Sequence, residues 1–435
     1  MPVPPRVSHA VETAPPAPRL RDLGRQFHIV RAQTERLAAP LSAEDCALQS
    51  MADASPTKWH LAHTSWFFET FVLERAVHGY VPFDPQFRVL FNSYYVAVGP
   101  RHPRPERGLL SRPGLDEVLA YRRHVDREMT RIFEQETAQD AVADIVELGI
   151  HHEQQHQELI LTDLKHLLSR NPLHPRYAEQ YFPWRPVGST RGEPSWIAIP
   201  GGLRHIGHDG KRFCFDNETP RHRVYTGGFE IAAAPVTNGE FLKFISDGGY
   251  ERAELWLSEG WDTRVAQSWR APLYWLPDGE VSRVFTLRGD QPLVLDEPVC
   301  HLSYYEADAY ARWAGARLPT ETEWETLALE CPVEGNLLES GRYHPCPAVE
   351  SSGALQVFGD VWEWTQSAYG PYPGYRPAGG AVGEYNGKFM VNQYVLRGGS
   401  CATPRSHIRP TYRNFFPAAA RWQFSGIRLA RDSGS

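Results

Sequence analysis

Two histidines one helical turn apart give this sequence its sharpest chemical signal. In the segment HHEQQHQE, His152 and His156 are four positions apart, so their rings project from the same face of a helix. Two imidazoles placed in this way can bind one metal ion. The string from His152 to His156 also fits H-E-x-x-H, the zinc metalloprotease pattern in which Glu153 would be the general base.

The metalloprotease interpretation needs a third ligand downstream of this pair. The metzincin continuation HxxGxxH is missing, because residues 156–162 read HQELILT. A downstream glutamate is hard to place as well, since the helical pattern ends near Leu168. Upstream, the segment KWHLAHTSW places His63 between Trp59 and Trp66 on one helix face.

A helix that faces the pair is the natural source of a third ligand. We therefore predict that His63, His152 and His156 bind one metal ion. Three neutral imidazoles with open coordination positions suit Zn(II), or an Fe(II) ion that must bind substrate and O₂ together. The residues alone do not separate these two metals. His60 and His151 lie on other helix faces, and we expect them to be structural or exposed.

Residues 21–185 are predicted to form a four-helix bundle that positions these histidines. Apolar residues recur every three or four positions over residues 20–37, which is typical of one face of a helix. The same periodicity predicts helices over residues 115–133 and 142–168. Bundles of this kind build metal sites from side chains on facing helices.

The remaining bundle helix carries His63. It is expected to begin at Ser55-Pro56, because Ser is a good N-cap and Pro fits the first helical turn. Residues 1–20 are rich in Pro and Ala and are expected to be a disordered tail. Residues 169–195 are rich in Pro, Arg and Gly and are expected to be a linker.

The second half of the chain, residues 186–435, has a different pattern. It is rich in Gly and Pro and carries short apolar runs such as SWIAIPGG, FEIAAAPVT, YVLRGGS and SGIRLA. Helices are expected over residues 303–314 and 320–329. Strands and helices in this irregular order predict an α+β domain. The chain of 435 residues is therefore expected to hold two domains.

Bulk composition limits the classes of partner and location. A net charge of −7 gives no reason to expect nucleic acid or an anionic membrane surface as a partner. No run of about 18 apolar residues occurs, so no membrane span is predicted. The six cysteines are scattered without a CxxC pair and are expected to be reduced thiols, which favours a cytoplasmic location. Cys401 is expected to be a core thiol.

Motifs in both halves resemble a known enzyme family. RLPTETEWE (317–325), GDVWEWT (359–365), RGGS (397–400) and GIRLA (426–430) resemble the formylglycine-generating enzymes, whose architecture is C-type-lectin-like. The helical half resembles the DinB-like four-helix domain. Together with NSYYVAVGPRHPRPERGLLSRP at residues 92–113, the two halves resemble the iron(II)-dependent sulfoxide synthases of ergothioneine biosynthesis.

The resemblance implies a non-haem iron(II) oxidoreductase. That family uses O₂ to join the thiol of cysteine or γ-glutamylcysteine to the imidazole of N-α-trimethylhistidine (hercynine), and the product is a sulfoxide. The iron ligands that it implies are His63, His152 and His156, the residues that the spacing also predicts. Three alternatives stay open: a sulfoxide synthase of the ovothiol type, a zinc-dependent hydrolase or thiol transferase, and a non-catalytic lectin-like binding module.

The two organic substrates need different binding groups. The α-carboxylate of the thiol substrate needs a cation, and Arg101 and Arg104 are the candidates because a guanidinium matches a carboxylate. The trimethylammonium group of the other substrate prefers aromatic faces. Asn414, Phe415 and Phe416 are the candidates for that pocket.

The resemblance also implies two further roles. Gln155 lies between the helical ligands and is expected to form a hydrogen bond with the substrate imidazole. An active-site tyrosine is expected to be Tyr94 or Tyr95. Adjacent residues of an extended segment point to opposite sides, so one of the two is expected to face the metal while the other packs.

Overall fold

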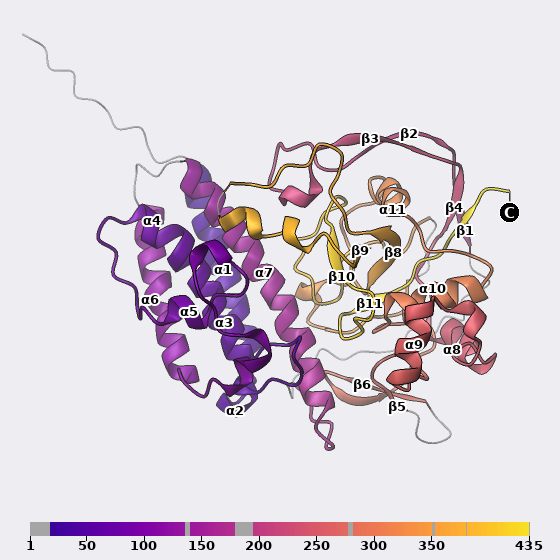
Figure 1. Cartoon of the computed structure of the whole chain (residues 1–435), viewed down its shortest axis with the longest axis horizontal. Helices are drawn as coiled ribbons and strands as arrows, with labels where there is room; N and C mark the ends of the chain where they lie inside the picture. The colour runs from indigo at the N-terminus through magenta and orange to yellow at the C-terminus, as the bar shows by residue number, and fades with distance from the viewer. Residues whose placement is uncertain are drawn as a thin grey trace, which may run out of the picture.

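The computed structural model describes residues 18–134, 140–178, 195–276, 282–349, 353–379 and 381–434. Over these residues the chain forms a helical part followed by an α+β part (Figure 1). The predicted tail lies outside the described residues up to residue 17. The first helix already begins at Pro18, so residues 18–20 are helical and the tail prediction is wrong for them. The predicted domain boundary between residues 185 and 186 also lies outside the described residues.

Four long helices form the helical part, as the apolar periodicity predicts. They are α1 (Pro18–Ala38), α3 (Thr57–Phe68), α6 (Leu115–Glu134) and α7 (Asp140–Ser169). Shorter elements lie between α1 and α6, namely α2 (Ala43–Ala47), the π-helical η1 (Glu69–Leu73), α4 (Glu74–Ala76), α5 (Phe87–Leu90), η2 (Val96–Val98) and η3 (Arg104–Leu109). Phe27 of α1, Trp66 of α3 and Val125 of α6 meet in one buried core, which holds the helices together by apolar burial.

The start of α3 differs from the predicted N-cap. Pro56 is the residue that precedes the helix, and no side chain caps it. The backbone N–H of Ser55 donates to Asp163 Oδ2 at 2.8 Å, and the Ser55 hydroxyl accepts from Arg107 Nη1 at 2.9 Å. Every residue of α3 is buried, and packing of this kind stabilises a helix without a side-chain cap.

Short strands in four sheets form the α+β part. One sheet orders β1 (Trp196–Ile199), β4 (Phe229–Ala232) and β12 (Ala430–Asp432). Another orders β10 (Asn414–Pro417), β9 (Gln393–Arg397), β8 (Trp362–Ala368) and β11 (Ser425–Gly426). Two smaller sheets pair β2 (Gly202–Ile206) with β3 (His222–Thr226), and β6 (Arg283–Thr286) with β5 (Trp275–Leu276) and β7 (Gly289–Pro292). Because β12 pairs with β4, the last strand closes the domain against one of its first.

The helices of this part are α8 (Asn238–Ser246), α9 (Ser258–Ala266), α10 (Tyr304–Trp313) and α11 (Glu321–Ala328). Single 3₁₀ turns are η4 (Asp216–Glu218), η5 (Ala253–Leu255), η6 (Leu338–Ser340), η7 (Ala381–Glu384) and η8 (Gly387–Phe389). Ser303 and Thr320 form capping boxes with the glutamates three residues on, which explains why α10 and α11 begin where the sequence predicts. The predicted α+β class is confirmed.

Charged residues of the four motifs mainly hold this fold. Arg397 of RGGS donates to Glu321 and Glu325 of RLPTETEWE at 3.0 Å each. Arg428 of GIRLA donates to Glu363 of GDVWEWT at 2.7 Å. All of these side chains are buried, and a buried charge is tolerated when it is paired and hydrogen-bonded. The motifs therefore serve the scaffold of the second half.

Helix α7 lies between the bundle and the α+β part (Figure 1). Glu158 of this helix accepts hydrogen bonds from three groups of the α+β part. The donors are Trp362 Nε1 at 2.7 Å, the Ser400 hydroxyl at 2.6 Å and the Thr403 hydroxyl at 2.9 Å. One helix thus carries bundle contacts on one side and the second domain on the other.

The thiols agree with the expectation from their spacing. All six cysteines are free, and Cys401 is completely buried in the core. Within the described part of the chain, no helix has both the length and the apolar character that crossing a bilayer requires. The cytoplasmic location stays a prediction.

Candidate metal centre

Three buried imidazoles converge where α3 faces α7. The Nε2 atom of His152 lies 3.2 Å from Nε2 of His63 and 3.1 Å from Nε2 of His156. The candidate ligand atoms all lie within 4.8 Å of one another. Helix α7 supplies the pair one turn apart and α3 supplies the third ring, so the structure brings together the three residues predicted as ligands.

The ring of His63 is held so that Nε2 points inward. Its Nδ1 lies 2.6 Å from the backbone carbonyl oxygen of Phe91, and the rings of Trp59 and Trp66 stack on it at centroid distances of 4.5 and 5.3 Å. A carbonyl oxygen can only accept a hydrogen bond, so Nδ1 carries the proton. Nε2 of His63 therefore presents a lone pair to the other two rings.

Burial keeps the three rings neutral. It lowers the pKa of His63 and His156 well below the ordinary range and the pKa of His152 to about 3, because removal from water disfavours the charged form. Neutral imidazole is the form that binds metal. Three neutral imidazoles whose Nε2 atoms meet in this way form a donor set that fits a divalent transition-metal ion.

Glu153 does not belong to this site. It is completely buried inside the bundle, where it accepts from Arg31 Nη1 at 3.0 Å and from Arg122 Nη2 at 2.9 Å. Burial alone would raise its pKa, but the two guanidinium groups lower it to about 2. A carboxylate held in this way is unavailable as a general base, so the metalloprotease interpretation of H-E-x-x-H is wrong for this chain.

A cavity of about 760 Å³ adjoins the three histidines and is lined by both parts of the molecule. From the helical part it receives α3, α7 and the segment that precedes α6. From the α+β part it receives β10 and residues around η7 and η8. The predicted site residues that line it, besides the three histidines, are Tyr94, Arg101, Arg104, Gln155, Asn414, Phe415 and Phe416.

Known proteins match both parts of the chain. Residues 26–160 match the DinB superfamily, and residues 185–344 and 339–433 match the sulfatase-modifying factor enzyme 1-like domain. The hercynine oxygenase of Mycolicibacterium thermoresistibile is 33% identical over 454 aligned residues, which cover 95% of this chain and 96% of that protein. The chain belongs to the hercynine oxygenase family.

Other relatives show how the similarity is distributed. The hercynine oxygenase of Mycolicibacterium smegmatis is 37% identical over 66% of this chain and 71% of its own length. The formylglycine-generating enzyme of Mus musculus is 29% identical over 55% of this chain and 72% of its own length. The resemblance that the motifs carry is thereby confirmed, and the family identity extends over the bundle that holds the three histidines.

In this member of the hercynine oxygenase family, Gln155 connects the two domains. Its Nε2 donates to the hydroxyl of Tyr412 at 2.7 Å, and its Oε1 accepts from the hydroxyl of Tyr385. The ring of Tyr385 lies 5.8 Å from that of His152, centroid to centroid. Tyr385 was not among the predicted site residues, because it lies 230 positions from Gln155 outside any motif.

Tyr94 and Tyr95 lie differently from the prediction. The chain bends at Tyr94, and the two rings stack on each other at 4.6 Å instead of pointing to opposite sides. They still differ in surroundings. Tyr95 is completely buried against Trp66 and Phe71, whereas Tyr94 lines the cavity and has the ammonium group of Lys388 above its ring at 4.8 Å.

The predicted arginines lie at the exposed side of the cavity. Arg101 donates to the carbonyl oxygen of Ser93 at 3.2 Å, and Arg104 donates to the carbonyl oxygen of Asp53. A guanidinium has five N–H groups, so these bonds leave donors for a ligand. Arg107 lines the same cavity but was not predicted; it is buried and its guanidinium lies 3.4 Å from the ring centre of Trp59.

The aromatic side of the cavity is built by β10 and its surroundings. Phe415 stacks on Tyr369 at 4.0 Å and lies 6.0 Å from Phe389, centroid to centroid. Phe416 meets Trp422 edge to face at 5.8 Å. These contacts fix the orientation of both rings, and Tyr369 covers one face of Phe415.

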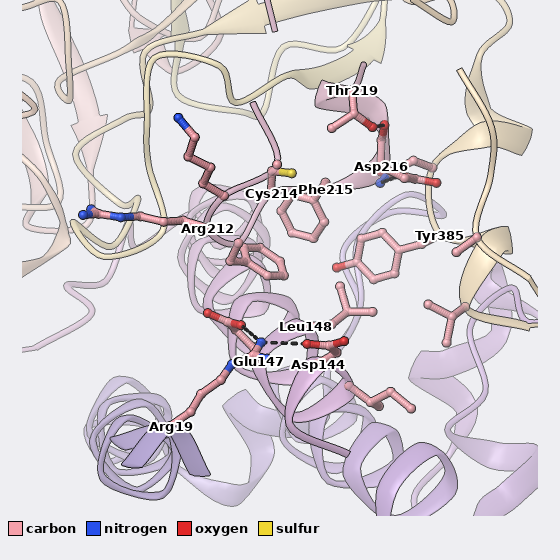
Figure 2. Close-up of a pocket in the computed structure, with 17 residues that line it drawn as sticks. Arg19, Asp144, Glu147, Leu148, Arg212, Cys214, Phe215, Asp216, Thr219 and Tyr385 are labelled. Carbon is pink, nitrogen blue, oxygen red and sulfur yellow. Dashed lines mark hydrogen bonds and ion pairs between the residues drawn. The ribbon is translucent and has the colours of Figure 1, made fainter. Parts of the chain in front are cut away.

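A second cavity of about 880 Å³ adjoins the first. Phe215 and Tyr385 line both cavities, and their rings stack at 5.4 Å. Figure 2 shows the two rings from the side of the second cavity. In the second cavity Arg19 pairs with Asp144 and Glu147 (Figure 2). The second cavity is lined by none of the predicted site residues, whereas the first is lined by the three histidines.

Proposed function

We propose that this chain uses iron(II) and O₂ to join a cysteinyl thiol to the imidazole of N-α-trimethylhistidine, with a sulfoxide as product. The thiol donor is cysteine or γ-glutamylcysteine. The observation that carries the proposal is the convergence of three neutral Nε2 atoms beside a cavity lined by both domains, in a chain of the hercynine oxygenase family.

Iron(II) is the metal that this donor set would serve. His63, His152 and His156 would hold it through Nε2, and three protein ligands leave positions open for a substrate thiol and O₂. When bound there, iron would supply the activation of O₂ and would favour the thiolate form of the substrate. Binding of the two organic substrates and proton transfer depend on side chains of the cavity.

The thiol substrate is held by its carboxylate in this proposal. Arg101 and Arg104 line the cavity and have no carboxylate partner among the described residues. A guanidinium and a carboxylate form a charge-assisted, bidentate pair. This pair orients the thiol toward the three histidines and excludes substrates without the acid group.

The betaine substrate is held at the opposite side. Phe415 and Phe416 offer their faces to the trimethylammonium group, and the side chain of Asn414 lies in the same wall. Gln155 lines the cavity and bonds Tyr412 and Tyr385, and in this proposal the remaining N–H of its amide bonds the substrate imidazole. Tyr94 lines the cavity and supplies a hydroxyl that can hold or donate a proton during turnover.

One experiment tests the reaction and the metal together. The full chain is purified without O₂, its metal content is measured, and hercynine with cysteine or γ-glutamylcysteine is supplied before O₂ is admitted. We expect about one iron per chain, O₂ uptake and a sulfoxide detected by mass spectrometry. A zinc-loaded protein that is inactive with and without added iron would contradict the proposal.

A further inference from the structure

A chain of hydrogen bonds leads from His156 to a buried carboxylate. Nδ1 of His156 lies 2.8 Å from Nδ1 of His60, and Nε2 of His60 lies 3.1 Å from Asp163 Oδ2. The same carboxylate oxygen accepts the backbone N–H of Ser55 at 2.8 Å. His60 is 1% exposed and Asp163 is 5% exposed, so water does not complete these contacts.

The carboxylate of Asp163 determines which atom donates in each of these hydrogen bonds. An ionised carboxylate accepts hydrogen bonds and donates none. His60 must therefore donate from Nε2, which leaves its Nδ1 with a lone pair in the neutral ring. That lone pair can only accept, so His156 donates from Nδ1. His156 is then left with a lone pair at Nε2, the atom that faces His152 at 3.1 Å.

The geometry points to His60 and Asp163 as positioning residues that fix His156 in the tautomer and ring orientation needed to bind a metal ion. This inference rests on the proposed role of the three histidines as ligands. His60 is not a fourth ligand, because its two nitrogens already face His156 and Asp163. Carboxylates behind metal-bound histidines act in this way, and here an additional imidazole transmits the effect.

The three ligands differ in how their second nitrogen is held. Nδ1 of His63 bonds a backbone carbonyl, and Nδ1 of His152 is buried without a hydrogen-bond partner. Only His156 depends on other side chains for this purpose. The orientation of the His156 ring is therefore sensitive to substitution at His60, whereas the His63 ring is held by a backbone carbonyl group that no substitution removes.

The test measures metal binding by the full-length, metal-free protein, with Co(II) as the probe. His60→Leu removes both hydrogen bonds, and we expect Kd for Co(II) to rise about 10- to 100-fold with a change in the visible absorption bands. His60→Asn places an amide group near the position of Nδ1, and it should recover most of the affinity. The control is His166→Asn, which changes a part-buried histidine of α7 that bonds Ser50, and it should match the parent.

Two further comparisons keep the inference testable. In His60→Gln the longer side chain reaches toward Asp163 but leaves His156 without an acceptor, so this variant should bind Co(II) as weakly as His60→Leu. If the leucine variant does not fold, the comparison of His60→Gln with His60→Asn still tests the inference. Equal affinities for the Asn and Gln variants, or parental affinity in His60→Leu, would overturn the inference. Failure of the parent itself to bind metal would instead overturn the proposed function.

Discussion

Glu158 on α7 and Trp362 on β8 share a hydrogen bond of 2.7 Å across the interface between the two domains. Glu158 also accepts from the hydroxyls of Ser400 and Thr403. It lies two residues after the ligand His156 and lines the same cavity. The carboxylate of Glu158 therefore fixes the position of the α+β domain relative to the three histidines.

Glu158→Ala should destabilise the protein and weaken substrate binding together. The hydroxyls of Ser400 and Thr403 lie 3.3 Å apart, so one of them can still donate to the other, but Trp362 Nε1 and one hydroxyl lose their acceptor, each at a cost of about 1–3 kcal/mol. We expect the free energy of unfolding in urea to fall by at least about 2 kcal/mol on that basis. Glu117→Ala removes an exposed glutamate of α6 and serves as the control. Equal losses in the two variants would show that the interface does not depend on this carboxylate.

His63→Ala, His152→Ala and His156→Ala should each lose the metal and the activity. Each variant removes one of three converging Nε2 atoms, and the α+β domain should keep its secondary structure because all three histidines come from the helical part. Metal content per chain and circular dichroism measure the two effects. His205→Ala changes an exposed histidine of β2 and should keep full metal content. Full occupancy in His63→Ala would remove that residue from the ligand set.

The sequence predicts features that are local along the chain. The pair His152 and His156 follows from helical spacing, and His63 follows from its place between two tryptophans on a facing helix. The same spacing leaves the role of Glu153 open. Its ion pairs with Arg31 and Arg122 exist only in the folded bundle, so the pattern alone could not exclude a metalloprotease.

Features that join distant segments could not be predicted in this way. Tyr385 reaches the site from the other domain, and nothing in its local sequence distinguishes it from a core tyrosine. Ser55 was predicted as a helix cap, but in the fold its N–H bonds Asp163. Tyr94 and Tyr95 were expected on opposite sides because the segment was taken as extended, whereas a bend at Tyr94 stacks the two rings.

His407→Gln should change how stability depends on pH. Burial, with His151 and Arg409 nearby, lowers the pKa of His407 well below the ordinary range. In the unfolded chain the pKa of a histidine is about 6.5. Below that pH the unfolded chain takes up a proton at His407 that the folded protein does not. The contribution of the neutral His407 ring to the free energy of unfolding is therefore fully present above about pH 6.5 and is lost as the pH falls.

The size of this effect is set by proton linkage. One such histidine costs about 1.4 kcal/mol of unfolding free energy per pH unit below its unfolded pKa. Glutamine does not titrate, so the stability of His407→Gln relative to the parent should rise as the pH is lowered from 7.5 to 5.5. Urea unfolding of the metal-free proteins at each pH measures this difference. A difference that stays constant with pH would contradict the prediction.

Arg101→Ala and Arg104→Ala should raise KM for the thiol substrate far more than KM for the betaine. A charge-assisted bond to a carboxylate contributes about 1.5–3 kcal/mol, which corresponds to about ten- to more than a hundredfold in KM. Arg112→Ala alters an exposed arginine of the same segment and is the matched control. Steady-state kinetics with each substrate varied in turn give the comparison. Equal effects on both substrates would count against a carboxylate clamp.

Tyr94→Phe and Tyr95→Phe should have different consequences because the two hydroxyls have different surroundings. Tyr94 lines the cavity, and Tyr95 is completely buried against Trp66 and Phe71, where its hydroxyl interacts with that of Tyr94. Phe keeps the ring and removes only the hydroxyl. The Tyr95 variant should therefore keep the parental product ratio, and its free energy of unfolding should change by no more than about 1 kcal/mol, the usual net contribution of one hydrogen bond.

The Tyr94 variant should change the outcome of turnover. A thiol that meets O₂ at the metal has two fates: oxygen adds to sulfur and gives a sulfinic acid, or sulfur joins the imidazole and gives the sulfoxide. A nearby phenol that donates a proton biases this choice. Tyr94→Phe should keep metal and both substrates but divert turnover toward sulfinic acid, as product partition by mass spectrometry at equal O₂ will show. If both variants keep the parental ratio of sulfoxide to sulfinate, the proton comes from another group. Tyr385 is then the next residue to test, because its ring lies 5.8 Å from that of His152.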